Sequence, residues 1–238
     1  MDEIEISAVL PVYNDREALS RAIPRSIEVL ERISERIELI VAEDGSTDGS
    51  AELANAAGLN DPRIRLLHSD ERLGRGRALQ RAIQASRGTV VCYYDVDLAT
   101  DIEHLPELVG AIREGAALAT GSRLMTGSSV RRTGEREIAS RGYNFLVRQC
   151  LGSQIHDHQC GFKAFDRALV LPLLPTVQAA HWFWDTELLV RAQKAGLRVH
   201  EFPVRWKAGK GTTVRVKDVF EMGSSIFKLW WQLYVSKD

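Results

Sequence analysis

Two aspartates, Asp95 and Asp97, stand one residue apart at the end of the apolar run TVVCYY (89–94). Side chains alternate along a strand, so the two carboxylates would point the same way and share one hard cation. Mg²⁺ and Mn²⁺ favour such oxygen ligands and leave positions for water and phosphate oxygens. The alternative is that these acids merely end a strand, with Asp101 capping the next helix. The motif alone leaves both interpretations open.

Three further polar segments follow predicted apolar strands. EDGSTDGS (43–50) places Asp44 where its carboxylate can accept hydrogen bonds from the edge of a nucleobase. LGRGRA (73–78) surrounds Arg75 with two glycines and can offer backbone amides and a cation to phosphate. TGSR (120–123) ends on Arg123. Each segment also has a purely structural interpretation, as a turn, a helix start or a solvated basic loop.

The pattern of apolar residues indicates how these segments are held. Short runs rich in β-branched residues predict strands at 6–12, 37–42, 64–68, 89–94 and 116–120. Helical spacing between them predicts helices at 16–33, 48–57, 76–86 and 103–113. Alternating strands and helices predict an α/β fold with a mostly parallel central sheet, in which ligands bind beyond the carboxyl ends of the strands. We therefore expect the polar segments to converge on one edge.

The second half of the chain is less regular. Helices are expected near 137–150 and from Asp185, and strands in CGFKAF (160–165) and VHEFPVRW (199–206). The segment 125–137 is small, polar and basic without periodicity, which predicts a mobile loop. We expect residues 1–216 to form one domain. Residues 217–238 should form an aromatic-rich amphipathic helix that packs on this domain or lies in a membrane interface.

Composition narrows the class of protein. The 31 basic and 32 acidic residues nearly cancel, so no bulk attraction to nucleic acid is expected. Three cysteines without a CxxC pair give no disulfide scaffold, and HDHQC (156–160) fits no common zinc spacing. There is no apolar run of about 18 residues and no signal peptide pattern at the N-terminus. We expect a cytoplasmic protein, possible peripheral contact with the cytoplasmic face of a membrane, and no nucleic-acid partner, with the oligomeric state left open.

Taken in order and spacing, LPVYND, EDGSTDGS, LGRGRA, DVD and TGSR resemble glycosyltransferase family 2, which comprises inverting enzymes that use nucleotide-sugar donors. The resemblance implies the GT-A fold and a metal-dependent enzyme. It implies that Asp95 and Asp97 hold Mg²⁺ or Mn²⁺ on the donor diphosphate. From its own place in LGRGRA, Arg75 is expected to add a positive charge beside that diphosphate. The resemblance also implies a set of residues around the base and ribose of the donor nucleotide: Pro11, Tyr13, Asp15 and Asp44. The family usually carries glutamate at the position of Asp15, which is a shorter acid.

The second half resembles the dolichyl-phosphate sugar synthases, which move a hexose onto a polyprenyl phosphate. GSRLMTGSSVRRTGEREIASRGYN, DHQCGFKAF and WFWDTELL carry this resemblance. It implies that Arg123, Arg136 and Ser140 bind phosphate. Lys207, in a basic stretch before the last helix, is a further candidate for the acceptor phosphate, and Asp185 for contact with the sugar or orientation of the acceptor. DVDLAT differs from the DADLQ of mannose-transferring relatives and is similar to the glucose branch, which uses UDP-glucose.

These features predict an inverting hexosyltransferase, with UDP-glucose as the favoured donor and dolichyl or polyprenyl phosphate as the acceptor. Asp95, Asp97 and Arg123 are the expected catalytic residues. A phosphate monoester, whose second pKa is about 6, needs no strong general base at neutral pH. The alternatives are a GDP-mannose donor, a saccharide or small-molecule acceptor with Asp185 as general base, and a non-catalytic nucleotide-sugar-binding protein.

Overall fold

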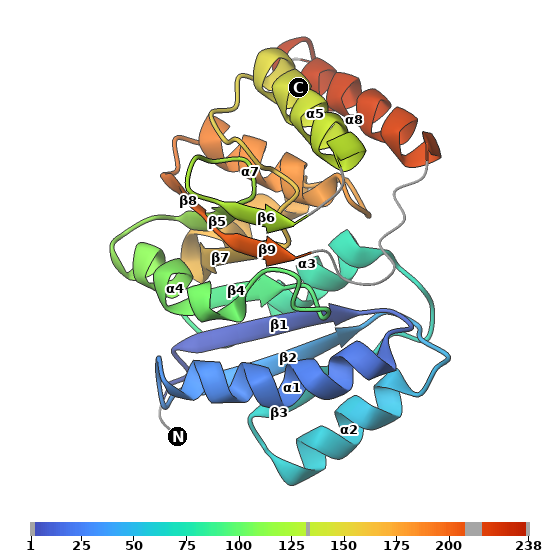
Figure 1. Ribbon diagram of the computed structural model, residues 1–238, viewed down its shortest axis with the longest axis vertical. Helices are drawn as coiled ribbons and strands as arrows, with labels where there is room; N and C mark the ends of the chain where they lie inside the picture. Colours follow the sequence, from blue (N-terminus) through green and yellow to red (C-terminus); the bar gives the residue numbers. More distant parts are fainter. Residues whose placement is uncertain (1–2, 132–133, 208–215, 237–238) are drawn as a thin grey trace.

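A seven-stranded sheet forms the centre of the protein, as seen in a computed structural model that describes residues 3–131, 134–207 and 216–236, without the side chains of residues 134–136 and 216–222. The strand order is β3-β2-β1-β4-β7-β5-β8 (Figure 1). The strands are β1 (Ile6–Val12), β2 (Ile37–Glu43), β3 (Ile64–Leu67), β4 (Val90–Tyr94), β5 (Leu118–Ser122), β7 (Phe162–Asp166) and β8 (Val199–Pro203). Neighbouring strands are parallel except that β7 runs antiparallel to β4 and β5. The predicted mostly parallel sheet is confirmed.

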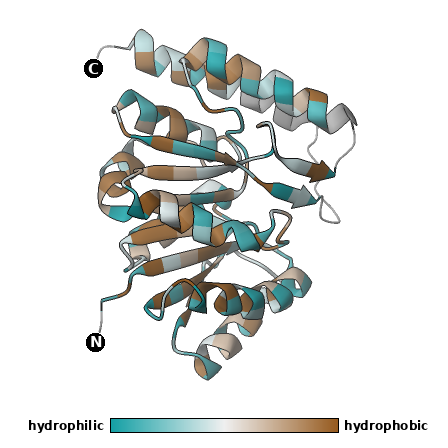
Figure 2. Ribbon diagram, turned by 60° about the vertical axis from the view of Figure 1, so that its left-hand side comes forward, coloured by the Kyte–Doolittle hydropathy of each residue, from teal (hydrophilic) through white to brown (hydrophobic). Residues whose placement is uncertain are grey.

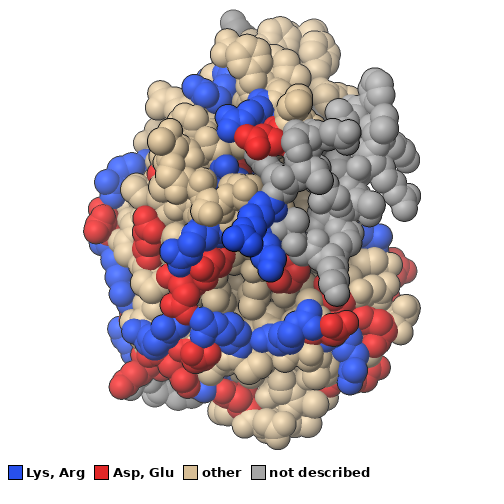
Figure 3. All heavy atoms as spheres, in the orientation of Figure 1, with Lys and Arg blue, Asp and Glu red and all other residues tan. Residues whose placement is uncertain are grey.

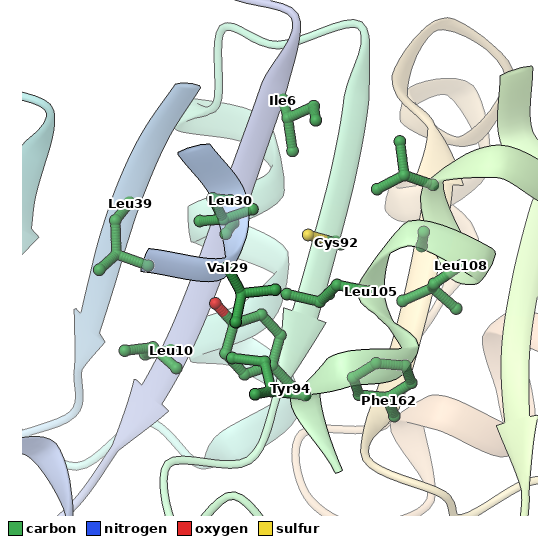
Figure 4. Close-up of a cluster of buried hydrophobic side chains, with 14 of the residues drawn as sticks. Ile6, Leu10, Val29, Leu30, Leu39, Cys92, Tyr94, Leu105, Leu108 and Phe162 are labelled. Atoms are coloured by element: carbon green, nitrogen blue, oxygen red, sulfur yellow. The ribbon is translucent and has the colours of Figure 1, made fainter. Parts of the chain in front are cut away.

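Helices cover both faces of this sheet, as the alternation of side chains along β1 requires. On one face, α1 (Arg16–Glu31), α2 (Ser50–Asn60) and α4 (Leu105–Arg113) pack on Leu10 and its neighbours, the cluster drawn in Figure 4. On the other face, α3 (Arg75–Ala85) and α7 (Trp184–Lys194) pack on Val9 and Tyr93. The sheet is therefore buried on both sides, and its strand ends are the places where polar groups gather.

Two long helices, α5 (Gly134–Leu151) and α8 (Val216–Tyr234), lie side by side beyond this layered core (Figures 1 and 2). Val147, Ile226 and Leu229 are buried between them and α7. The expected C-terminal helix thus has one face packed on the domain, while Phe227 and Trp231 remain more than half exposed. Among the described residues, no helix combines the length and apolar character needed to cross a membrane.

Two expectations for the second half are wrong. The segment 125–137, predicted as a mobile loop, contains the strand β6 (Ser129–Arg131), and α5 begins within it. The single strand expected at 199–206 is divided into β8, which pairs with β5, and β9 (Arg205–Lys207), which pairs in parallel with β6. The division falls at Val204. Its N–H donates to the carbonyl of Ser122, the last residue of β5, and the chain then leaves the main sheet. A three-residue strand is too short for periodicity to reveal.

Short connections complete the second half. α6 (Arg167–Val170) follows β7, and 3₁₀ turns occupy Ile102–His104 and Leu171–Thr176. The segment after the second turn leads to α7 and touches the start of α3, where the Gly76 N–H donates to the carbonyl of Ala180 at 2.9 Å. A Cβ on Gly76 would lie 2.5 Å from the Cβ of the fully buried Trp184. The glycine after Arg75 is therefore required for the close approach of α3 and α7.

We predict that Gly76→Ala lowers the free energy of unfolding by about 1–3 kcal/mol, because the added methyl group must push α3 away from Trp184. Gly110→Ala is the matched control: Gly110 lies in α4 with open space around the added methyl, so its helix propensity gain of up to about 1 kcal/mol should appear as stabilisation. Urea unfolding measures both changes. Equal effects of the two substitutions would contradict this account of the α3–α7 contact.

Candidate active site

Three carboxylates converge at the carboxyl ends of the parallel strands. β1 leads into Asp15, and the neighbouring strand β4 leads into Asp95 and Asp97. The pKa of Asp97 is raised, first by burial and then by the negative charges of Asp95 and Asp15. This mutual repulsion means that a cation bound at Asp95 and Asp97 would be stabilised.

Asp95 and Asp97 fit a divalent cation of the Mg²⁺ or Mn²⁺ type. Gly161 leaves room for Asp95, since a Cβ on Gly161 would overlap that carboxylate. The two acids lie within a tight turn that the Leu98 N–H closes by donating to the carbonyl of Asp95, with Leu98 at a φ of 51° and the Ala99 N–H donating to the Asp97 carboxylate at 3.0 Å. The described residues contain no group of three or more His, Cys, Asp or Glu arranged as a ligand set. Two carboxylates would therefore supply only part of a coordination sphere, and water and phosphate oxygens would suit the remainder.

Arg75 joins the carboxylate pair to the second half of the chain. Its guanidinium contacts Asp95 at 2.8 Å and Asp185 at 2.7 Å. The other oxygen of Asp185 accepts the hydroxyl of Tyr93 and lies 3.6 Å from Nζ of Lys163. Burial raises the pKa of Asp185 to about 6 against the opposing charge of Arg75, and burial lowers the pKa of Lys163 to about 8. With both oxygens engaged, Asp185 holds Arg75 in place.

Arg123 is paired with a fully buried carboxylate, Asp157. Its Nε and one terminal nitrogen donate to the two oxygens of Asp157 at 2.7 and 2.8 Å, and its backbone N–H adds a third bond at 3.0 Å. Burial opposes the ionisation of Asp157, but the charge of Arg123 outweighs burial and lowers its pKa to about 2. From sequence, Arg123 was predicted to bind phosphate, and no role was predicted for Asp157. HDHQC, which contains Asp157, was the only available signal.

The residues expected around the nucleotide lie at the same edge, each with a structural contact of its own. Asp44 accepts the backbone N–H groups of Leu73 and Gly74 at 2.8 and 2.9 Å and so fixes the loop that carries Arg75. Asp15 caps α1 through the N–H of Ala18 at 3.2 Å.

Two further residues of that set lie on and after β1. Pro11 is within β1. Tyr13 is 40% exposed, and the guanidinium of Arg72 stacks 3.9 Å from the centre of its ring. Arg72 was not expected from sequence. A planar cation on an exposed ring marks a flat surface of the kind on which a nucleobase can stack.

The described residues that were expected to bind the acceptor phosphate form no hydrogen bond or ion pair with one another, although Arg123 lies 5.7 Å from the ring centre of Trp206, the neighbour of Lys207. Ser140 lies in α5, with its hydroxyl buried and without a hydrogen-bond partner among the described residues. Lys207 is exposed at the end of β9. The side chain of Arg136 lies outside the described residues. No hydrogen bond or ion pair between described residues joins Ser140 or Lys207 to Arg123.

The fold and the placement of the carboxylates define the class: this is the GT-A fold of nucleotide-sugar transferases. Glucosyl-3-phosphoglycerate synthase from Mycobacterium tuberculosis, solved in complex with Mn²⁺, UDP and glucosyl-3-phosphoglycerate, has the same fold, with a TM-score of 0.68 and 23% identity over 99% of this chain and 81% of that one. Residues 7–172 match the model of glycosyl transferase family 2. The chain belongs to that family.

Curated relatives extend the similarity over the whole chain. Glycosyltransferase AglD of Haloferax volcanii is 49% identical over 98% of this chain, which spans only 38% of AglD. A dolichyl-phosphate beta-glucosyltransferase of Trichomonas vaginalis is 30% identical over 95% of this chain and 71% of that protein. The Saccharomyces cerevisiae dolichyl-phosphate beta-glucosyltransferase is 28% identical over 89% of this chain and 69% of that protein. The expected resemblance to this branch of the family is confirmed.

The segment that carries Asp157 is fixed by a buried histidine. Nδ1 of His158 lies 2.7 Å from the amide oxygen of Asn144, and Nε2 lies 2.7 Å from the hydroxyl of Ser153. Burial lowers the pKa of His158 from 6.5 to about 3, so the folded chain holds this imidazole neutral. The unfolded chain takes up a proton at His158 between these pH values and the folded chain does not.

We therefore predict that the free energy of unfolding falls as the pH drops from about 6.5 towards about 3. The contribution is fully present above pH 6.5 and decreases by at most about 1.4 kcal/mol per pH unit below it. His158→Gln should flatten this slope, whereas His200→Gln, at an exposed position of β8, should leave it unchanged. Urea unfolding at a series of pH values measures the slopes. An unaltered slope in His158→Gln would refute the assignment of this pH dependence to the buried imidazole of His158.

Proposed function

We propose that this chain is an inverting hexosyltransferase that moves a hexose, with glucose favoured, from a nucleotide-sugar donor to a polyprenyl or dolichyl phosphate. UDP-glucose is the favoured donor. The observation that carries the proposal is the Asp95–Asp97 pair, held by Arg75 at the carboxyl edge of the sheet in a family 2 chain. The dolichyl-phosphate glucosyltransferases among its relatives support the acceptor, and the Mn²⁺ and UDP in the similar fold support a metal-bound donor diphosphate.

The donor fits along the edge formed by β1, β2 and β4. The nucleobase would stack on the ring of Tyr13. The loop that Asp44 holds through the N–H of Leu73 would form the adjacent wall of the base site. Asp95 and Asp97 would hold Mg²⁺ or Mn²⁺ against the diphosphate, where a divalent cation neutralises the charge of the leaving group. Arg75, which lies against Asp95, would add a positive charge beside the same diphosphate.

The transfer needs one displacement. An oxygen of the acceptor phosphate forms a bond to the anomeric carbon while the bond from that carbon to the diphosphate oxygen breaks. The electron pair leaves with the nucleoside diphosphate, and attack from the opposite side inverts the anomeric configuration. The phosphate monoester is already largely ionised at neutral pH, so this chain has no proton to remove. Its residues have to align two anions, which is chiefly a matter of positioning and charge.

A saccharide acceptor is the second candidate, because it needs a general base and burial raises the pKa of Asp185 to about 6, within the useful range for a base. Against it, Asp185 is only 2% exposed, and both its oxygens are engaged by Arg75, Tyr93 and Lys163. This geometry favours Asp185 as a positioning residue for Arg75. A membrane-facing location for the enzyme would follow from a lipid acceptor and is part of the same proposal.

We predict that the purified protein with Mg²⁺ or Mn²⁺ makes a lipid-linked hexose from UDP-glucose and a short polyprenyl phosphate. Asp97→Asn should reduce the rate by on the order of 100-fold or more. The metal would lose one of its two carboxylate ligands and would stabilise the charge of the leaving diphosphate less well. The melting temperature should not fall, since the substitution relieves the repulsion between Asp97 and Asp95. Asp70→Asn, at a fully exposed position, is the control. GDP-mannose and soluble sugars are assayed in parallel, and unchanged activity of Asp97→Asn under chelation would reject the proposal.

Asp185→Asn separates the two acceptor classes. If Asp185 positions Arg75, the loss in kcat should stay below the roughly 100-fold that removal of a general base costs, and the pH profile of the rate should keep its shape. If Asp185 is a base, the wild-type rate should decline as the pH falls below about 6, and the variant should lose this limb together with most of its activity. A pH–rate series for both proteins decides between these results.

A further inference from the structure

The small sheet of β6 and β9 places two cations side by side. The parallel register pairs Arg131 of β6 directly with Lys207 of β9. Both residues are exposed, and neither side chain forms an ion pair or a hydrogen bond with another residue that the structure describes. Like charges directly opposite each other on neighbouring strands are unfavourable. An anion bound between the two side chains would attract both and offset their mutual repulsion.

The two cations line a groove of about 410 Å³. Figure 3, in the same view as Figure 1, shows that Lys and Arg side chains on this face of the molecule are interspersed with Asp and Glu. Two other arginines of the groove are already neutralised, Arg25 by Glu28 and Glu103 at its side, and Arg205 by Asp101 at 2.8 Å. Among the groove residues that the structure describes, the cations without a carboxylate partner are therefore Arg131 and Lys207.

The groove opens beside the metal-binding carboxylates. Leu98 and Ala99, which directly follow Asp97, form part of its wall. The N–H of Lys207 donates to the carbonyl of Ala99 at 2.8 Å, and Trp206 pairs with Thr100 in an isolated bridge. The backbone thus fixes β9 against the turn that presents Asp97, and an anion in the groove would lie next to the donor diphosphate.

Arg123, one of the cations that the sequence assigns to the acceptor phosphate, is already paired with another side chain. Arg123 uses two of its guanidinium nitrogens on the buried Asp157. Arg131 and Lys207 have no side-chain hydrogen bond to any residue in the described part of the chain, so their donors are available with respect to those residues. A phosphate monoester at neutral pH carries between one and two negative charges, about −1.5 to −2, and so matches two uncompensated cations better than the single charge of a phosphodiester does.

We propose that the groove between β6 and β9 binds the phosphate monoester of the acceptor, with Arg131 and Lys207 as its charge-assisted hydrogen-bond donors. Trp206, also on the groove wall, offers an apolar surface to the chain attached to that phosphate. The assignment to the acceptor rests on the proposed function, whereas binding of a phosphate group rests on the groove alone.

The first experiment tests the anion site without catalysis. Inorganic phosphate is titrated into the wild-type protein, Arg131→Gln, Lys207→Gln and the double variant, with calorimetry as the readout. We expect the double variant to bind roughly 10-fold or more weakly, because both charge-assisted bonds are lost. Arg36→Gln, an exposed cation before β2 at the opposite edge of the sheet, should bind as the wild type does. Equal phosphate binding by the wild type and the double variant would overturn the proposal.

The second experiment identifies the source of the phosphate. The double variant should raise the KM for a short polyprenyl phosphate by roughly 10-fold or more and leave the KM for UDP-glucose unchanged. Its sedimentation with phosphatidylglycerol vesicles that lack acceptor should equal that of the wild type. An unchanged acceptor KM with weaker vesicle binding would overturn the assignment in favour of a phospholipid headgroup. Absence of transfer by the wild type, with phosphate binding still dependent on Arg131 and Lys207, would reject the proposed function and leave the anion site standing.

Discussion

The double ion pair of Arg75 is the interaction on which the site depends. Asp95 follows β4 of the first half, and Asp185 lies at the start of α7 in the second half, and one guanidinium contacts both at less than 3 Å. This contact requires α3 to begin close to α7, which the lack of a side chain at Gly76 permits. A buried charge that loses one partner is costly, so packing and electrostatics fix the same geometry. Arg75 therefore links the position of the Asp95 carboxylate, the proposed metal ligand, to that of α7.

The second buried pair, Arg123 with Asp157, has a different consequence. It anchors the segment after β5 to the loop before β7 through three hydrogen bonds. An arginine held in this way keeps its charge at all pH values of interest and still presents one nitrogen beyond the pair. Arg123 therefore contributes a fixed positive charge near Asp95. Because two of its nitrogens are used by Asp157, the remaining hydrogen bonds to an acceptor phosphate have to come from other side chains.

Much of the first half could be predicted from sequence, and the reason is physical. The strands β1, β2 and β4 are buried on both faces, so their apolar runs are continuous, and the polar residues after them mark the strand ends. Asp95 and Asp97 were found in this way. Asp157 and Tyr93 were missed as partners because each meets its partner across 34 or more residues of sequence, a separation over which no local pattern acts. The β6–β9 sheet was missed because three residues cannot display a period.

The β6–β9 sheet explains how a protein can tolerate two adjacent cations. Each strand is only three residues long and would not be stable alone. The Ser129 N–H donates to the carbonyl of Val204, and the Lys207 N–H donates to the carbonyl of Ala99. The main domain therefore fixes the backbone of the small sheet at both ends. Exposure to solvent then keeps the repulsion between Arg131 and Lys207 small. In the free protein the two cations repel each other only weakly. Once an anion and an apolar chain exclude water from the groove, the local dielectric constant falls, and each cation attracts the anion more strongly. Affinity for a lipid-borne phosphate would accordingly exceed affinity for the free ion at the same two side chains.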